Sequence, residues 1–329
     1  MAISYEMLTS FALGELLSMT KVKLSMSFLK HHHHALYLAP LALVVTHMIW
    51  GASSPIFKWA LEDISPFTLA FLRFFLATLI LLPFTIHQIR VRVKDLGKLF
   101  LLGFVGFTLH IGLLFVGLSK TSSINVPIIA SSAPVMLILA SMLVLREKVK
   151  PKVLYGTMIS LLGVGMIMFR PFLDNGLDGT FVGNLFVVAS IVAFVIYTIL
   201  LKEFQLKYSA ITMLFWMFAI AAITFFPFFF VETFPSVLVP QLTTQSAFGI
   251  LFGAVFTSVI AYGGYNYAVK HMHVNQTGVF SYLAPIVAIL TAVPLLGEHV
   301  TPAYIIGSIL VFAGIFIAEI KLNHHPKHH

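Results

Sequence analysis

The chain has 329 residues, of which 59% are hydrophobic and only 10% are charged, and its mean hydropathy is +0.98. Such a composition excludes a water-soluble globular domain, whose surface needs far more charge, and predicts an all-α integral membrane protein. The sequence contains no cysteine, which excludes disulfides, thiolate metal sites and cysteine nucleophiles, and we interpret the net charge of +8 as a signal of topology rather than of nucleic-acid binding.

The first 36 residues do not resemble a cleavable signal peptide, because Glu6 and Glu15 interrupt their apolar stretch and the basic residues follow it. We expect a cytoplasmic N-terminal extension over residues 1–36 and a His-rich cytoplasmic tail over residues 321–329. Histidine runs can bind metal ions, but no structured set of ligands accompanies either run. We therefore predict no metal site and no bound cofactor.

Ten apolar runs of roughly the length that crosses a bilayer follow the extension. A cytoplasmic N-terminus would place sixteen of the twenty Lys and Arg residues on the inner side, so the positive-inside rule predicts that both termini are cytoplasmic. The predicted crossings are residues 37–60, 66–88, 97–118, 123–145, 153–170, 181–201, 209–231, 246–269, 275–296 and 303–320.

The first crossing carries a polar and aromatic stripe, because His47, Trp50 and Ser54 recur at helical spacing on an otherwise apolar helix. We interpret these three as substrate-binding residues that line a cavity. The alternative for His47 is a neutral histidine that bonds to a neighbouring helix.

The second crossing contains Arg73 about seven residues from its outer end. A guanidinium at that depth needs a partner or water, so we predict a substrate-binding role, with snorkelling to the headgroups as the alternative. Nearer the rim, Lys58 and Glu62 have the i, i+4 spacing of an ordinary ion pair.

Crossings 3, 4 and 6 supply further candidates. His110 has the same two interpretations as His47, and Tyr197 is a further aromatic candidate. Pro134 lies near the middle of crossing 4, where a missing N–H frees a backbone carbonyl, so we predict a helix kink at the substrate cavity. A bend that serves only packing is the alternative. Ser131 shares the face of Pro134 and is counted with the site.

Crossing 8 gathers Tyr262, Tyr265 and Asn266 within about one helical turn. We predict a pocket in which the amide contacts a polar group of the substrate and the tyrosines stack on its apolar part. Interhelical hydrogen bonding is the alternative, but it contributes only about 0.6 kcal/mol on average in membranes.

The sequence repeats itself, because residue n matches residue n + 151 without a gap from Ala133 to Gly163. Each repeat has five crossings, an odd number, so the second repeat must enter the membrane from the opposite side. We therefore predict ten transmembrane helices in two inverted five-helix repeats around a central cavity. The corresponding positions include Ser131 and Tyr282, Pro134 and Pro285, Glu147 and Glu298, Gly156 and Gly307, and Gly163 and Gly314.

These correspondences add candidates in the second repeat. Tyr282 joins the substrate-binding set, and Pro285 is a second predicted kink at the cavity. Glu147 and Glu298 lie at the ends of their crossings, so we predict structural roles in capping and loop anchoring rather than a proton relay. The four matched glycines have the seven-residue spacing of helix-packing surfaces.

The order of these features resembles the EamA-type branch of the drug/metabolite transporter superfamily. The resemblance covers roughly residues 37–320 and rests on "WGASSPIFKWAL" from Trp50, "LAFLRF" from Leu69 and the repeated element from Pro to Glu. It implies two EamA domains and the export of amino acids or related metabolites across the bacterial cytoplasmic membrane. The implied division is 37–170 and 181–320, with an extracytoplasmic connecting loop at 171–180.

No phosphate loop, metal-ligand cluster or nucleophile with its base is visible in the sequence, so we predict that the chain is not an enzyme. The leading hypothesis is a secondary transporter, monomeric or homodimeric, that moves a small amphipathic metabolite outward through the bilayer by alternating access. One alternative is a lipid-handling, flippase-type or non-transporting membrane subunit. Another is an importer of the same fold.

Overall fold

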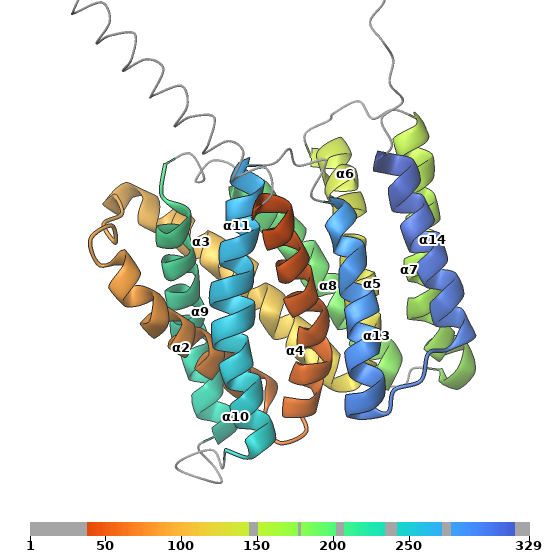
Figure 1. The fold of residues 1–329 in the computed structure, drawn as a ribbon, viewed down its shortest axis with the longest axis horizontal. Helices are drawn as coiled ribbons and strands as arrows, with labels where there is room; N and C mark the ends of the chain where they lie inside the picture. Colours follow the sequence, from red (N-terminus) through yellow and green to blue (C-terminus); the bar gives the residue numbers. More distant parts are fainter. Residues whose placement is uncertain are drawn as a thin grey trace, which may run out of the picture.

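The computed structural model describes residues 38–144, 151–176, 179–201, 207–233, 242–271 and 278–319. All regular elements in these ranges are helices, and they lie side by side in one bundle (Figure 1). The first helix spans Leu38–Ala60. It is followed by α2 (Pro66–Thr85), η1 (Val93–Asp95), α3 (Leu96–Gly103), η2 (Phe104–Leu109), α4 (His110–Lys120), α5 (Asn125–Ser131), α6 (Ala133–Val144), α7 (Pro151–Asn175), α8 (Gly179–Leu201), α9 (Ala210–Thr233), α10 (Thr244–Leu251), η3 (Phe252–Ala261), α11 (Tyr262–His271), η4 (Gly278–Tyr282), α13 (Leu283–Leu296) and α14 (Pro302–Glu319).

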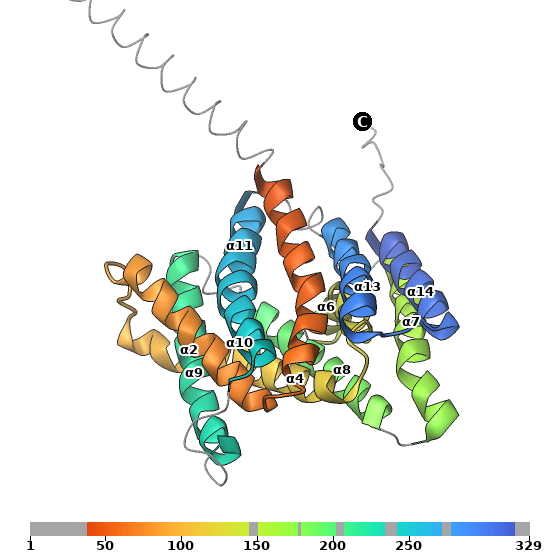
Figure 2. The ribbon, with the colours of Figure 1, turned by 60° about the horizontal axis from the view of Figure 1, so that its bottom comes forward.

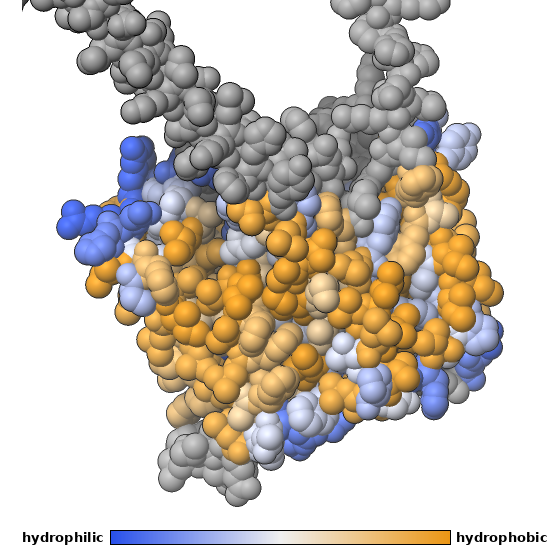
Figure 3. All heavy atoms as spheres, viewed as in Figure 1, coloured by the Kyte–Doolittle hydropathy of each residue, from blue (hydrophilic) through white to orange (hydrophobic). Residues whose placement is uncertain are grey.

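The bundle has the surface of a membrane protein. Seven helices of the described residues are long and apolar enough to cross a membrane, and three further apolar helices are shorter. A broad hydrophobic band crosses the visible face, with hydrophilic residues along its upper and lower edges (Figure 3). Large side chains such as Leu162, Ile223 and Leu290 are about two-thirds exposed, which suits lipid rather than water. The all-α membrane fold is confirmed, whereas the count of ten crossings stays a prediction.

The arrangement of the helices places the first helix near the centre. It lies between α11 and α13, while α2 and α9 lie at one end of the bundle and α7 and α14 at the other (Figures 1 and 2). The first helix begins and α14 ends on the same face of the bundle, as an even number of crossings requires (Figure 1).

Reciprocal glycine contacts join α7 to α14. A Cβ atom added at Gly156 would lie 2.5 Å from the carbonyl oxygen of Gly314, and one added at Gly163 would lie 2.5 Å from that of Gly307. The lower-numbered residue of one helix meets the higher-numbered residue of the other, so the two helices run antiparallel. Replacing each residue by its repeat equivalent converts one contact into the other, which is the relation that a two-fold axis between inverted repeats produces.

A second shared feature is a π-helical segment in the third crossing of each half. In the first half η2 separates α3 from α4, and in the second half η3 separates α10 from α11. Each segment ends immediately before a predicted site residue, His110 in one and Tyr262 in the other. A π-helix widens the turn and changes which side chains face a neighbour, and such segments are frequent at functional sites.

The structure shows the backbone around Pro134 and Pro285, the two predicted kinks. Helix α5 ends at Ser131 and α6 begins at Ala133, so Pro134 lies in the first turn of a new helix. Pro285 likewise lies in the first turn of α13, after the 3₁₀ segment η4. Proline is well tolerated in a first turn, where its missing N–H has no helical partner in any case. Both crossings therefore change their helical geometry next to the proline, and a kink at a substrate cavity stays a prediction.

The C-terminal end of α9 caps the N-terminus of α2. The carboxylate of Glu232 accepts hydrogen bonds from the backbone N–H of Thr68 at 2.8 Å, from its hydroxyl at 2.9 Å and from the N–H of Phe67 at 3.4 Å. These N–H groups belong to the first turn of α2, which has no partner for them within the helix. A carboxylate at that position also interacts favourably with the helix dipole.

We expect Glu232→Ala to lower the free energy of unfolding by about 1–2 kcal/mol, because it removes both the acceptors and the charge at this helix end. Thermal melting of the purified protein in detergent measures the change. Asp174→Asn is the control, since Asp174 forms an exposed ion pair with Arg170 that contributes little. An unchanged melting temperature for Glu232→Ala would contradict the capping role.

Candidate functional site

The candidate site is built around Trp50, which the first helix holds against α11. The centre of the Trp50 ring lies 5.3 Å from that of Tyr262 and 5.4 Å from that of Tyr265. The His47 ring meets the Trp50 ring edge-on at 5.6 Å. Four residues predicted from two distant crossings are thus brought together, and the contact joins one repeat to the other.

Small residues allow the first helix to come so close to its neighbours. A Cβ atom added at Gly51 would lie 2.4 Å from the carbonyl oxygen of Ala284, in the first turn of α13. A Cβ added at Gly264 would lie 2.9 Å from the hydroxyl of Thr46, which itself donates to the carbonyl of Ala261 at 3.1 Å. The first helix is therefore packed backbone to backbone against α11 and α13.

Phe107 extends these contacts toward α8. Its ring centre lies 5.4 Å from that of Tyr262 and 5.6 Å from that of Tyr197, in the range of favourable aromatic pairs. Gly106 makes room for Tyr197, since an added Cβ would lie 2.2 Å from the ring. We call Trp50, Phe107, Tyr197, Tyr262 and Tyr265 the aromatic cluster.

Arg73 lies beside the aromatic cluster and is 3% exposed. Its guanidinium carbon is 4.9 Å from the centre of the Phe74 ring and 5.1 Å from that of Phe57, and its Nε donates to the hydroxyl of Ser258 at 3.0 Å. The Phe74 ring in turn contacts Phe107 at 5.9 Å. The snorkelling alternative is therefore excluded, because the head group lies inside the bundle.

Both histidines of the predicted site bond to backbone carbonyl groups. His47 Nδ1 lies 2.9 Å from the carbonyl oxygen of Leu43 in its own helix, and His110 Nδ1 lies 2.9 Å from that of Ser190 in α8. Each is buried, with 7% exposure. The His110 contact is the alternative that the sequence left open, a histidine bonded to a neighbouring helix, although Nε2 stays available for a ligand.

The structure shows other surroundings for four further predicted site residues. The Ser131 hydroxyl donates to the carbonyl oxygen of Pro127 at 2.8 Å, and the Ser54 hydroxyl donates to the carbonyl oxygen of Gly51 at 3.5 Å. Tyr282 packs edge-on against Phe312 at 4.9 Å. Asn266 is half-buried on α11, one residue beyond Tyr265. A substrate-binding role for these four stays a prediction.

Glu298 anchors the start of α5 and pairs with Lys58. Its carboxylate accepts hydrogen bonds from the N–H groups of Ser123 at 2.7 Å and Ile124 at 3.2 Å and from the Ser122 hydroxyl at 2.5 Å. Lys58 Nζ lies 3.7 Å from Glu298 and also donates to the carbonyl of Thr121. The predicted pair of Lys58 with Glu62 is wrong, because a partly buried carboxylate from the other repeat, Glu298, pairs with the ammonium instead. Glu147 lies outside the described residues.

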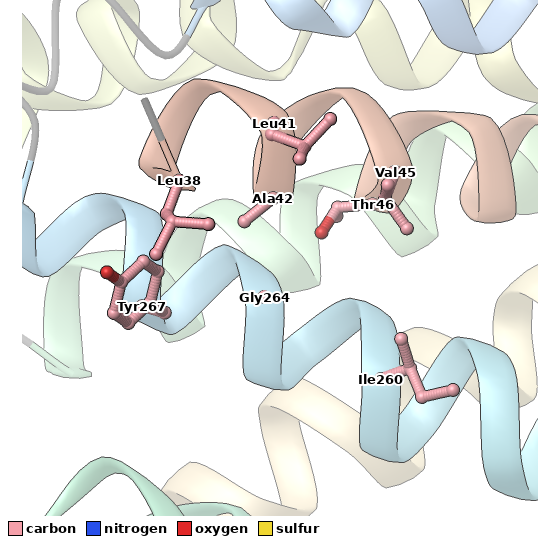
Figure 4. A pocket seen from close by; sticks show the side chains of 8 residues that line it. All are labelled: Leu38, Leu41, Ala42, Val45, Thr46, Ile260, Gly264 and Tyr267. Carbon is pink, nitrogen blue, oxygen red and sulfur yellow. The ribbon is translucent and has the colours of Figure 1, made fainter. Parts of the chain in front are cut away.

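A groove of about 340 Å³ opens on the side of the bundle between the first helix and α11 (Figure 4). Leu41, Val45 and Ile260 form part of its apolar lining, and Thr46 and Tyr267 contribute hydroxyl groups. The central cavity predicted from the sequence stays a prediction, since aromatic rings fill the region around Trp50.

Ser258, Phe57 and Phe107 were not singled out from the sequence. Ser258 had a usable signal, because it precedes Tyr262 by four residues and therefore lies on the same face of the helix. Phe57 and Phe107 had no distinguishing signal in the sequence, since the chain contains 32 phenylalanines.

Comparisons with known proteins place this chain among membrane transporters. An uncharacterized transporter of Archaeoglobus fulgidus is 30% identical over 282 residues, which cover 85% of this chain and 98% of the relative. The uncharacterized transporter YetK of Bacillus subtilis is 26% identical over 289 residues, covering 86% and 87%. A solved crystal structure with 18% identity superposes with a TM-score of 0.60 over 85% of this chain and 95% of that one, which supports the fold alone.

The family model described as the EamA-like transporter family matches the chain twice, over residues 38–169 and 181–319. The predicted resemblance to EamA-type transporters with two EamA domains is confirmed, and the prediction that the chain is not an enzyme agrees with a family of transporters. The predicted boundaries of the connecting loop and the terminal segments stay predictions. The chain belongs to the EamA-like transporter family.

Proposed function

We propose that this transporter moves a small amphipathic metabolite, such as an amino acid or a related solute, out across the bacterial cytoplasmic membrane by alternating access. The observation that carries the proposal is the contact of Trp50 with Tyr262 and Tyr265, since it places aromatic and hydroxyl groups of both repeats in one cluster. A site shared by two inverted repeats can open to either side as they exchange conformations. Cytoplasmic termini agree with the common face on which the first helix begins and α14 ends (Figure 1).

The aromatic cluster suits the apolar part of such a solute. Tyrosine and tryptophan rings offer flat apolar faces, and their hydroxyl and indole N–H groups can orient a polar end. Within the described residues every Asp and Glu lies at or beyond a helix end, so coupling through a carboxylate at the middle of a crossing is disfavoured.

We expect Trp50→Ala to reduce saturable flux of the substrate into reconstituted vesicles by about tenfold or more, because the ring spans the contact between the repeats. The screen uses radiolabelled amino acids, organic acids and nucleosides. Trp59→Ala is the matched control, since Trp59 lies on the same helix but packs at the rim against Phe248 at 6.3 Å. Equal loss in both variants, or saturable flux that is unchanged in Trp50→Ala, would count against the site.

The lateral groove between the first helix and α11 favours a second candidate function, lipid handling. Its lining is apolar apart from Thr46 and Tyr267, which suits an acyl chain (Figure 4). Reconstituted protein that moves a fluorescent phospholipid between leaflets, and transports none of the soluble solutes, would support this candidate over metabolite export.

A further inference from the structure

Arg73 is a buried cation that pairs with no carboxylate among the residues that the structure describes. The structure shows three ion pairs among the residues it describes, Lys58 with Glu298, Arg170 with Asp174 and Lys207 with Asp95, and Arg73 is in none of them. A guanidinium has five N–H donors, of which only the Nε–H has a hydrogen-bond acceptor in the described part of the chain. Burying an unpaired guanidinium costs free energy, so we interpret Arg73 as a residue that function requires.

Several neighbouring features hold Arg73 in place rather than neutralise it. Ser258 accepts its Nε–H, and the rings of Phe57, Phe74 and Phe115 lie within 6.0 Å of the guanidinium carbon. A Cβ added at Gly253 would lie 3.0 Å from the Cδ atom of Arg73, so the glycine makes room for the side chain. Both Ser258 and Gly253 belong to the π-helical segment η3. These contacts fix the orientation of the cation and leave its Nη donors for a ligand.

The cation and the aromatic cluster form one contiguous surface. The Phe74 ring contacts Phe107 at 5.9 Å, Phe107 contacts Tyr262 at 5.4 Å, and Tyr262 contacts Trp50 at 5.3 Å. Ser258 lies about one turn before Tyr262 on the same crossing. A ligand with one anionic end and one apolar end matches this order of groups.

In the described part of the chain, no carboxylate lies among these contacts to receive an ammonium group. The acidic side chains that the structure describes near the bundle lie at helix ends, and each of Asp95, Glu232 and Glu298 already accepts hydrogen bonds there. A zwitterion or an amine would therefore bring its positive charge toward Arg73 without compensation. Like charges brought together in a low-dielectric region repel each other strongly, which selects against such ligands.

We propose that Arg73 binds the carboxylate of the substrate and that the transported solute is a monoanionic amphipathic acid, such as a 2-oxo acid or an N-acylated amino acid. The proposal rests on the proposed function and narrows its substrate class. It also supplies a driving force, because the inside-negative potential of a bacterial membrane expels an anion. A carrier of this kind needs no intramembrane carboxylate for proton coupling.

Binding is tested with four probes that share one apolar body: 3-phenylpropanoate, its primary amide 3-phenylpropanamide, 3-phenylpropylamine and phenylalanine. A second series uses 4-methylpentanoate with its amide, its amine and leucine. We expect a carboxylate to stabilise the full-length protein against heat and to bind about tenfold or more tightly than its amide, amine or zwitterion. Equal binding by the zwitterion or the amine, or no stabilisation by either carboxylate, would overturn the proposal.

Variants separate binding from structure. We expect Arg73→Met to lose the preference for carboxylates while its melting temperature without ligand stays equal or rises, because an apolar side chain of similar volume suits the surrounding phenylalanines. A merely structural arginine would give the opposite result, lower stability with the preference retained. Arg170→Met is the matched control, since Arg170 is exposed and pairs with Asp174, and it should keep the preference.

Flux through the unaltered protein gives an independent readout. In vesicles with valinomycin, a tenfold potassium gradient should change the final distribution of the transported carboxylate about tenfold, toward the positive side. A distribution that ignores the potential overturns the anion proposal. If a zwitterion or an amine shows saturable flux that Trp50→Ala removes, the proposed function stands and only this inference fails. If no solute of any charge is transported, both fail.

Discussion

Leucine in place of Gly163 should prevent α7 and α14 from packing and should lower the free energy of unfolding by about 3 kcal/mol or more. The space for even one methyl group is missing, since an added Cβ would lie 2.5 Å from the carbonyl oxygen of Gly307 and 2.7 Å from the N of Val311. Both atoms belong to backbone, which cannot rotate aside as a side chain would. Close backbone approach at small residues is a main source of helix association in membranes, so the loss is large.

Melting of the purified variant in detergent, followed by size-exclusion chromatography, measures the effect. Gly165→Leu is the matched control, because Gly165 lies on the same helix and an added Cβ there meets no atom within 4 Å. The reciprocal contact predicts that Gly314→Leu lowers the free energy of unfolding by a similar amount, since its added Cβ would lie 2.4 Å from the N of Ser160. A melting temperature of Gly163→Leu equal to that of Gly165→Leu would contradict the close packing of α7 against α14.

Glu298→Ala should lower the free energy of unfolding by about 2–4 kcal/mol, because it leaves two backbone N–H groups, a hydroxyl and an ammonium without their shared acceptor. The Glu298 side chain is 12% exposed and that of Lys58 27%, so water replaces these contacts only in part. Glu298→Gln should cost less, since an amide oxygen can still accept from Ser123 or Ile124.

Glu62→Ala is the control for this substitution. Glu62 lies on the same rim, and its side chain is exposed. Thermal melting of the three variants and of Lys58→Met gives the comparison. A Glu298→Ala protein as stable as Glu62→Ala would show that the carboxylate does not anchor the start of α5.

The sequence was informative wherever one element could be interpreted alone. Apolar runs predicted the helices, and the four matched glycines predicted helix-packing surfaces, although not that α7 and α14 pack against each other. The polar stripe of the first crossing and the tyrosines of crossing 8 were each visible as unusual residues in an apolar helix. That Trp50 meets Tyr262 could not be derived, because the rotation of each helix about its axis depends on packing with neighbours.

The wrong expectation for Lys58 came from relying on local spacing alone, because a carboxylate distant in the sequence competes for the ammonium. Lys58 has Glu62 four residues away, but Glu298 offers the ammonium a site from which water is largely excluded. Pro134 and Pro285 predicted an irregular backbone but not its geometry. A proline inside a kinked helix and a proline in the first turn of a helix have the same sequence pattern.

The reciprocal contacts of α7 and α14 also bear on how such a chain can arise. Because the Gly156–Gly314 contact turns into the Gly163–Gly307 contact when the repeats are exchanged, two copies of one five-helix chain inserted in opposite orientations would make the same interface. The protein thus has the architecture of an antiparallel homodimer joined into a single polypeptide. Once the halves are joined, their sequences can differ, so Arg73 can lie in one half and Tyr262 in the other. A nearly symmetric framework can then bind an asymmetric solute.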